Sequence, residues 1–261
     1  HMRLVSDWSS DVCSSDLPHI VQIHDAVVAE DLCYIVMEYV AGGTLEAHTQ
    51  PGSLLPVDRV VELVFKCTRA LDFAYRLGIT HRDIKPANIL LAGGPDIKIS
   101  DFGAAIIKHA SIQRTQVTGI GSPAYMSPEQ AQEQHLDHRT DIYSLGVVLH
   151  QLLTGELPFS ATNNFSMVYQ IVHGEPARPS TQRPGLPPVL DEIVARAMAR
   201  DVDARYQTWP AFAHDLAQAV RNRQLRTPRG DFPDTEKFAT LRALPFFTDF
   251  TDVEIWEALR F

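Results

Sequence analysis

The chain has 261 residues, of which 45% are hydrophobic and 21% charged, and this composition suits a globular protein with a sizeable core. Its formal charge of −9 comes from 32 acidic and 23 basic residues that are intermingled, which argues against a nucleic-acid partner. The three cysteines form no C-x-x-C pair, so neither a zinc site nor a disulfide framework is predicted and a reducing cytoplasm is favoured.

No membrane span or signal peptide is predicted. The most apolar stretch, residues 145–153, is interrupted by polar residues and is far shorter than the roughly 18 residues that a crossing needs. No basic region leads into an apolar run at the N-terminus. Residues 1–17 repeat a Ser-Ser-Asp theme without periodicity and are interpreted as a non-native tail, in which His1-Met2 resembles a cloning scar and residues 7–17 resemble translated adapter sequence.

Two strand-like segments follow the tail. Residues 20–28 and 32–40 are rich in β-branched and aromatic residues and are separated by Ala-Glu-Asp, which predicts an antiparallel pair. The period then changes, because from Pro56 the apolar residues recur at helical spacing until Gly78. This helix is expected to pack one face on the core.

A second, shorter hairpin is predicted from residues 89–91 and 97–100, which are joined by the turn-forming sequence AGGPD. The sequence is irregular over residues 104–127. Residues 141–154 are then apolar on most sides, as in a buried central helix, and Gly155 is expected to end that helix.

The C-terminal third begins as a helical body that extends to about Asn222, with proline-rich loops at 176–188. Residues 223–236 are polar and contain proline, as expected of a linker. Residues 237–261 begin a second element, in which TDVE has the form of a helix capping box. This tail resembles the beginning of a cyclic-nucleotide-binding domain, and a plain amphipathic docking helix is the alternative.

Two motifs carry the chemistry. Residues 81–88 read HRDIKPAN and residues 101–103 read DFG, and the pair resembles the catalytic loop and metal-binding triplet of protein kinases. Antiparallel pairing of the intervening hairpin supports the match, because Asn88 precedes its first strand and Asp101 follows its second. Their oxygens should therefore converge on one metal ion, and Mg²⁺ prefers such hard ligands.

The resemblance implies a role for each polar residue of these motifs. Asp83 would accept the proton of the substrate hydroxyl, and Lys85 would neutralise the transferring phosphate. Asn88 and Asp101 would hold the Mg²⁺ that accompanies ATP. His81 is interpreted as an apolar packing partner of the Phe in DFG, because a lone histidine is more often structural than catalytic.

The substrate side has its own signature. Residues 121–129 read GSPAYMSPE and resemble the end of a kinase activation segment, with Ser-Pro-Glu in place of the commoner Ala-Pro-Glu. Ser122 occupies the position at which serine/threonine kinases place a hydroxyl beside the catalytic aspartate, so protein serine or threonine acceptors are favoured. Glu129 is expected to form a structural ion pair with Arg205.

Control by phosphorylation is suggested by Arg82, which precedes the catalytic Asp83. A phosphate on the activation segment would pair with this arginine and order the loop. Thr115 and Thr118 are the leading acceptors, with Ser111 behind them. That these are ordinary loop hydroxyls is the alternative.

The resemblance also places the adenine site. Residues 37–40, MEYV, resemble the kinase hinge, where backbone groups of Glu38 and Val40 would bond to the adenine and Leu90 would lie beneath the ring. Without the family, this segment is only the end of a buried strand. The Gly42-Gly43 pair that follows is a turn rather than a phosphate cradle.

The small-lobe signatures of a kinase are missing. The first glycine is Gly42 and the first lysine is Lys66, so neither the glycine-rich loop nor the strand lysine has a counterpart before the hinge. The predicted fold is α+β and protein-kinase-like over residues 18–222, mostly a helical C-terminal lobe with a remnant of the N-terminal sheet. The predicted function is a serine/threonine protein kinase, inactive in this form; a pseudokinase-like scaffold is the alternative.

Overall fold

The computed structural model describes residues 19–28, 33–93, 96–102 and 123–221. The predicted non-native tail, the linker at 223–236 and the second element at 237–261 lie outside these ranges. Four strands form two separate antiparallel pairs: β1 (Ile23–Val28), β2 (Cys33–Met37), β3 (Ile89–Leu91) and β4 (Ile97–Ile99). Both predicted hairpins are confirmed.

The remaining regular elements of the described chain are helices. The α-helices are α2 (Val57–Arg76), α4 (Pro128–Ala131), α5 (Arg139–Thr154), α6 (Asn164–His173), α7 (Pro179–Gln182), α8 (Pro188–Ala197) and α9 (Trp209–Arg221). Short 3₁₀ turns are formed by Leu45–His48, Pro86–Asn88, Pro123–Tyr125 and Val202–Ala204. None of the helices in these ranges has the length and apolar composition needed to cross a membrane.

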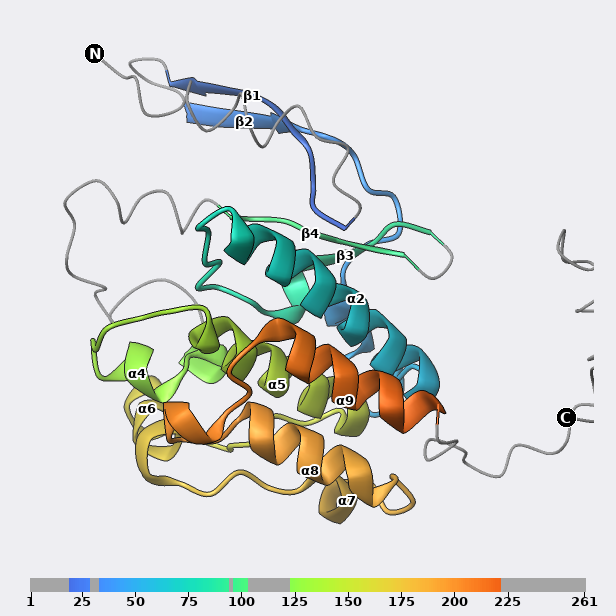
Figure 1. Cartoon of the computed structure of the whole chain (residues 1–261), viewed down its shortest axis with the longest axis vertical. Helices are drawn as coiled ribbons and strands as arrows, with labels where there is room; N and C mark the ends of the chain where they lie inside the picture. The colour runs from blue at the N-terminus through green and yellow to red at the C-terminus, as the bar shows by residue number, and fades with distance from the viewer. Residues whose placement is uncertain (1–18, 29–32, 94–95, 103–122, 222–261) are drawn as a thin grey trace, which may run out of the picture. The chain divides into compact units, whose positions relative to one another are not determined.

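The two long helices predicted from the apolar pattern of the sequence are confirmed. Helix α2 begins after Pro56 and ends just before Gly78, whose φ of 77° favours glycine. Helix α5 has every residue from Thr140 to Thr154 buried, and it ends at Gly155 in the left-handed conformation. Because α5 packs against both α2 and α8, it forms the centre of the core (Figure 1).

Several boundaries differ from the predictions. The second strand was expected over residues 32–40 but is Cys33–Met37, so Glu38 and Val40 follow the strand and are not part of it. The first strand was expected from Ile20 but begins at Ile23, since Ile20 instead bridges to Ile99 of β4. The proline-rich loop at 176–188 contains the short helix α7, because proline is well tolerated in the first turn of a helix. The irregular stretch ends in the 3₁₀ turn at Pro123–Tyr125.

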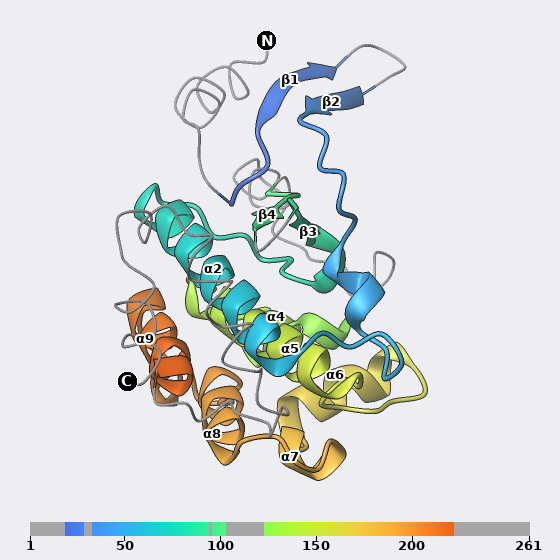
Figure 2. The same ribbon diagram turned by 90° about the vertical axis from the view of Figure 1, so that its right-hand side faces the viewer.

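The β1–β2 hairpin differs from the rest of the molecule in its exposure. Four consecutive residues of β2, from Tyr34 to Met37, are between 41% and 52% exposed. Alternate residues of a strand point to opposite faces, so both faces of β2 are partly exposed at these four residues. Strands β3 and β4 lie between this hairpin and the helices (Figures 1 and 2).

Candidate active site

Three predicted catalytic residues meet in the turn between α2 and β3. The Asp83 carboxylate accepts hydrogen bonds from Lys85 Nζ at 2.8 Å and from Asn88 Nδ2 at 3.2 Å. Asn88 Nδ2 also donates to the Asp83 carbonyl at 2.8 Å. The carboxylate is therefore held between a cation and an amide while Asp83 itself stays partly exposed to solvent.

The β3–β4 hairpin brings the two proposed metal ligands to one end, as its pairing predicts. Ile89 pairs with Ile99, and the Ser100 amide donates to the Asn88 carbonyl at 2.9 Å. The amide nitrogen of Asn88 is bonded to Asp83, so its side-chain oxygen is the atom that can serve as a ligand. Together with the Asp101 carboxylate this is a hard-oxygen donor set, which fits Mg²⁺. Asp101 has a φ of 62°, a left-handed conformation that non-glycine residues adopt only in a small share of cases.

His81 has a larger structural role than packing. Its ring lies 4.6 Å from that of Phe102, as predicted for packing partners. Its Nδ1 also accepts from the Asp83 amide at 3.2 Å, and its Nε2 lies 2.8 Å from the Ser100 carbonyl. Burial lowers the pKa of His81. A neutral ring with the proton on Nε2 satisfies both bonds and links the catalytic loop to the strand that leads to Asp101.

Asp141, in the first turn of α5, supports the catalytic loop and was not identified as a site residue from the sequence. Its two carboxylate oxygens accept the backbone N–H groups of His81 and Arg82, each at 2.7 Å. Burial raises the pKa of Asp141 to about 7, against the opposing effect of these hydrogen bonds and of the Arg82 charge. Gln130 donates to the Arg82 carbonyl at 2.9 Å. These bonds hold Arg82 in a left-handed conformation with a φ of 66°.

An acidic residue in the first turn of an otherwise apolar helix was the only signal for Asp141. A carboxylate in the first turn of a helix is expected on local grounds, because carboxylates favour helix N-termini, so its position does not indicate a role in the site. Its true partners lie about 60 residues earlier in the chain.

The Gly-Gly turn that follows the predicted hinge lies against β3. The Leu91 amide donates to the Gly43 carbonyl at 2.9 Å, and Thr44 bridges to Leu90. A Cβ at Gly42 would lie only 2.1 Å from the Leu91 carbonyl oxygen, so this close approach requires glycine. The segment from Glu38 through Val40 therefore leads directly to the strand that contains Leu90.

The predicted catalytic Ser122 and the predicted regulatory residues are only partly within the described chain. Ser122, Thr115 and Thr118 lie outside it, and so does Ser111. Arg82 is described, and its buried Nε has no hydrogen-bond partner among the described residues.

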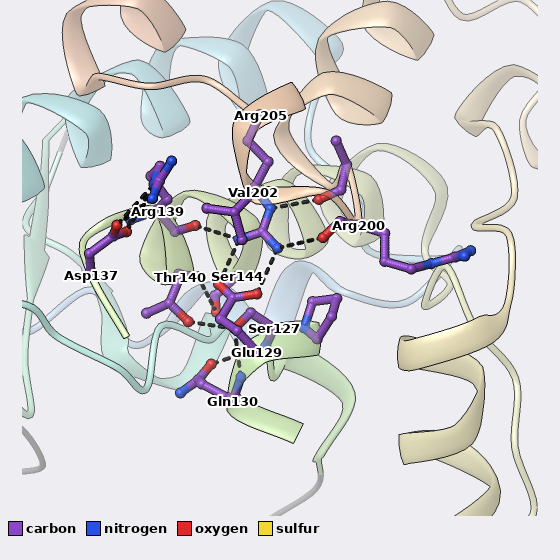
Figure 3. A network of polar contacts seen from close by, with 12 residues as sticks. Ser127, Glu129, Gln130, Asp137, Arg139, Thr140, Ser144, Arg200, Val202 and Arg205 are labelled. Carbon is purple, nitrogen blue, oxygen red and sulfur yellow. Dashed lines mark hydrogen bonds and ion pairs between the residues drawn. The ribbon is translucent and has the colours of Figure 1, made fainter. Parts of the chain in front are cut away.

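The predicted Glu129–Arg205 pair is confirmed as a buried, two-pronged ion pair (Figure 3). Arg205 Nη1 and Nη2 donate to the two carboxylate oxygens, both at 2.7 Å. Arg205 also donates to the carbonyls of Ala199 and Arg139 at 2.6 and 3.0 Å. Burial favours a higher pKa for Glu129, but the hydrogen bonds and charge of Arg205 outweigh it and the pKa is lowered.

Comparison with known proteins agrees with the geometry of the site. The protein kinase domain family model matches residues 11–217. The chain belongs to the protein kinase domain family. The predicted α+β, protein-kinase-like fold is thereby confirmed.

Similar proteins include bacterial serine/threonine-protein kinases named PknB. The chain is 38% identical over 229 residues to that of Mycobacterium leprae and 40% identical over 231 residues to that of Mycobacterium tuberculosis, with 85% of this chain and 35% of each relative covered. It is 36% identical over 244 residues to SCO3848 of Streptomyces coelicolor, named a probable serine/threonine-protein kinase, with 87% of this chain and 36% of that protein covered. The chain thus spans about a third of the length of these relatives.

Proposed function

We propose that the protein to which this chain belongs transfers the γ-phosphate of ATP to serine or threonine hydroxyls of other proteins. The observation that carries the proposal is the cluster of Asp83, Lys85 and Asn88 at the same end of the hairpin as Asp101. Phosphoryl transfer needs positioning and charge neutralisation more than covalent chemistry, and this cluster provides both. The relatives are named serine/threonine-protein kinases, which supports serine and threonine as acceptors.

In this proposal each side chain has one task. Asp83 orients the acceptor hydroxyl and accepts its proton, with its carboxylate fixed by Asn88. Lys85 places a positive charge beside that carboxylate, where the transferring phosphate would come. Asn88 and Asp101 would hold Mg²⁺, which supplies charge neutralisation for the phosphates when bound.

A second candidate, a pseudokinase-like binding module, is favoured by one observation about this 261-residue chain. Its first lysine, Lys66, belongs to α2 and is bonded to Asp96 at 2.7 Å, so it is not a strand lysine for the α- and β-phosphates. The intact Asp83 and Asp101 argue for catalysis instead. We propose that the 261-residue chain transfers phosphate very slowly, because it has neither a glycine-rich loop nor a strand lysine before the hinge to position the α- and β-phosphates.

Radiolabelled ATP with Mg²⁺ and a generic basic protein would test both proposals. The chain alone is compared with the same chain preceded by the complete small lobe of a PknB relative, and Asp83→Asn is the control in each. We expect negligible transfer by the chain alone, and phosphoserine or phosphothreonine that depends on Asp83 from the completed protein. Phosphotyrosine alone, or no phosphate from a folded completed protein, would overturn the kinase proposal. Robust transfer by the chain alone that is lost in Asp83→Asn would overturn the proposal of inactivity.

The division of the chain into domains rests on sequence resemblance. We propose a kinase domain at 18–222, a linker at 223–236 and the start of a cyclic-nucleotide-binding domain at 237–261. Calorimetric titration of a longer protein containing residues 237–261 with cyclic AMP and cyclic GMP would test this. Binding of either nucleotide supports it, and binding of neither contradicts it.

A further inference from the structure

One ion pair connects the predicted hinge to β4. Lys98 Nζ lies 2.5 Å from Glu38 Oε1, and the two side chains are only 25% and 24% exposed. The same carboxylate oxygen accepts the Gln22 amide at 2.7 Å, and the Glu38 amide donates back to the Gln22 carbonyl at 2.9 Å. Gln22, Glu38 and Lys98 are called the hinge clasp below.

The hinge clasp joins both connections between the β1–β2 hairpin and the rest of the molecule. The connection before β1 lies along β4, because the Val21 amide donates to the Ile99 carbonyl and the Ile99 amide donates to His19, each at 2.9 Å. The connection after β2 begins at Glu38 itself. Lys98 therefore closes a ring from β4, through residues 19–22, to Glu38 and back to β4.

The position of Lys98 relates this ring to the proposed nucleotide site. Lys98 pairs directly with Leu90 across the β3–β4 hairpin, so the two side chains share a face of that sheet. Leu90 is the residue proposed to lie beneath the adenine. Three residues after Lys98, the same strand leads to Asp101. Lys98 therefore contacts the hinge at Glu38, pairs with Leu90 and lies in the strand that leads to Asp101.

Electrostatics favours a charged pair here. Burial favours a higher pKa for Glu38, but the hydrogen bond and charge of Lys98, the Gln22 amide and the charge of His24 together lower it. A partly buried pair with a second, backbone hydrogen bond is better fixed than an exposed pair, which contributes little.

We infer that Lys98 is a positioning residue that holds the hinge backbone at Glu38 in register with the strand leading to Asp101. The inference rests on the proposed nucleotide site, although the clasp itself is a property of the fold. Lys98 would act through Glu38 and need not touch the nucleotide.

The test measures amide hydrogen exchange at Val21, Gln22 and Glu38 in the 261-residue chain, together with its affinity for ADP in the presence of Mg²⁺. The variants are Lys98→Met, Glu38→Ala and the double variant, with Lys98→Arg as the conservative replacement. Lys66→Met is the matched control, because it breaks another lysine–carboxylate pair of the same β3–β4 hairpin, to Asp96 at 2.7 Å. Exchange in α5 reports global stability and separates local opening from general destabilisation.

We expect exchange at Gln22 and Glu38 to become about fivefold to tenfold faster in Lys98→Met, with no comparable change in α5. The double variant should open no further than the larger single effect, Lys98→Arg should restore protection, and Lys66→Met should leave these amides unchanged. ADP affinity should fall in parallel with the local opening.

Unchanged exchange at Gln22 in Lys98→Met, or equally faster exchange in α5, would contradict the claim that Lys98 holds Gln22 and Glu38 together. Local opening without any loss of ADP affinity would overturn its positioning role. If the unaltered chain binds no ADP while the exchange results hold, the proposed nucleotide site fails and so does the positioning role, but the clasp stands.

Discussion

The helical body and the β1–β2 hairpin differ greatly in how much of their side-chain surface is buried. In the body, the central helix α5 is buried from Thr140 to Thr154, and a carboxylate and a guanidinium pair away from water. In the hairpin, consecutive residues of β2 remain exposed on both faces. The proposed transfer residues are attached to the body, through the hydrogen bonds of Asp141 to the catalytic loop. The proposed backbone contacts to adenine, at Glu38 and Val40, follow directly after the β1–β2 hairpin, so the two halves of the site differ in how firmly they are held.

The largest expected effect comes from the buried ion pair of the body. Arg205→Met leaves the Glu129 carboxylate buried without its partner, and we expect a loss of about 3–5 kcal/mol in the free energy of unfolding. Asp203→Asn, in the exposed Arg139–Asp203 pair, is the control and should cost less than about 1 kcal/mol. Urea denaturation checks both, and equal losses in the two variants would contradict the contrast.

The next test compares one isoleucine from each region. Ile142→Ala removes a fully buried side chain of α5 and should cost about 2–5 kcal/mol, because it leaves a cavity. Ile35→Ala removes a side chain that is 52% exposed in β2 and should cost less than about 1 kcal/mol. Thermal and urea unfolding of the two variants gives the measurement. A loss in Ile35→Ala as large as that in Ile142→Ala would show that the β1–β2 hairpin packs tightly after all.

A smaller effect is expected from the titration of Asp141. Its pKa is about 7 in the folded chain and 3.8 in the reference state, so between these values the folded chain binds the extra proton. Stability from this group is therefore present at low pH and lost as the pH rises towards and through 7. Asp141→Asn does not titrate, so its deficit relative to the unaltered chain should be larger at pH 5 than at pH 8, by on the order of 2 kcal/mol.

Urea unfolding of both proteins across that pH range gives the measurement. A deficit that does not change with pH would show that the two backbone hydrogen bonds keep Asp141 ionised throughout. A deficit that grows with rising pH would show that its pKa is lowered in the folded chain.

Local patterns in the sequence predicted much of this molecule. The period of α2, the glycine after α5 and the hairpin that joins Asn88 to Asp101 all depend on residues close together in the chain. The Glu129–Arg205 pair was predicted through the family resemblance. Asp141 and Lys98 were missed as supporting residues, because each contacts its partners across about 60 residues. Nothing in the local pattern of either residue distinguishes it from a helix-terminal acid or a surface strand lysine.

The most direct test of the proposed site uses Mn²⁺ as a paramagnetic substitute for Mg²⁺, added with millimolar ADP to the isotope-labelled chain. We expect the positions of Asn88 and Asp101 to depend on the helical body and the β3–β4 hairpin, and not on the β1–β2 hairpin. We therefore expect selective broadening of the amide signals of Asn88 and Ser100, with signals of α8 and α9 unaffected, and loss of that broadening in Asp101→Asn. Uniform broadening, or broadening at Asn88 that persists in Asp101→Asn, would contradict the account.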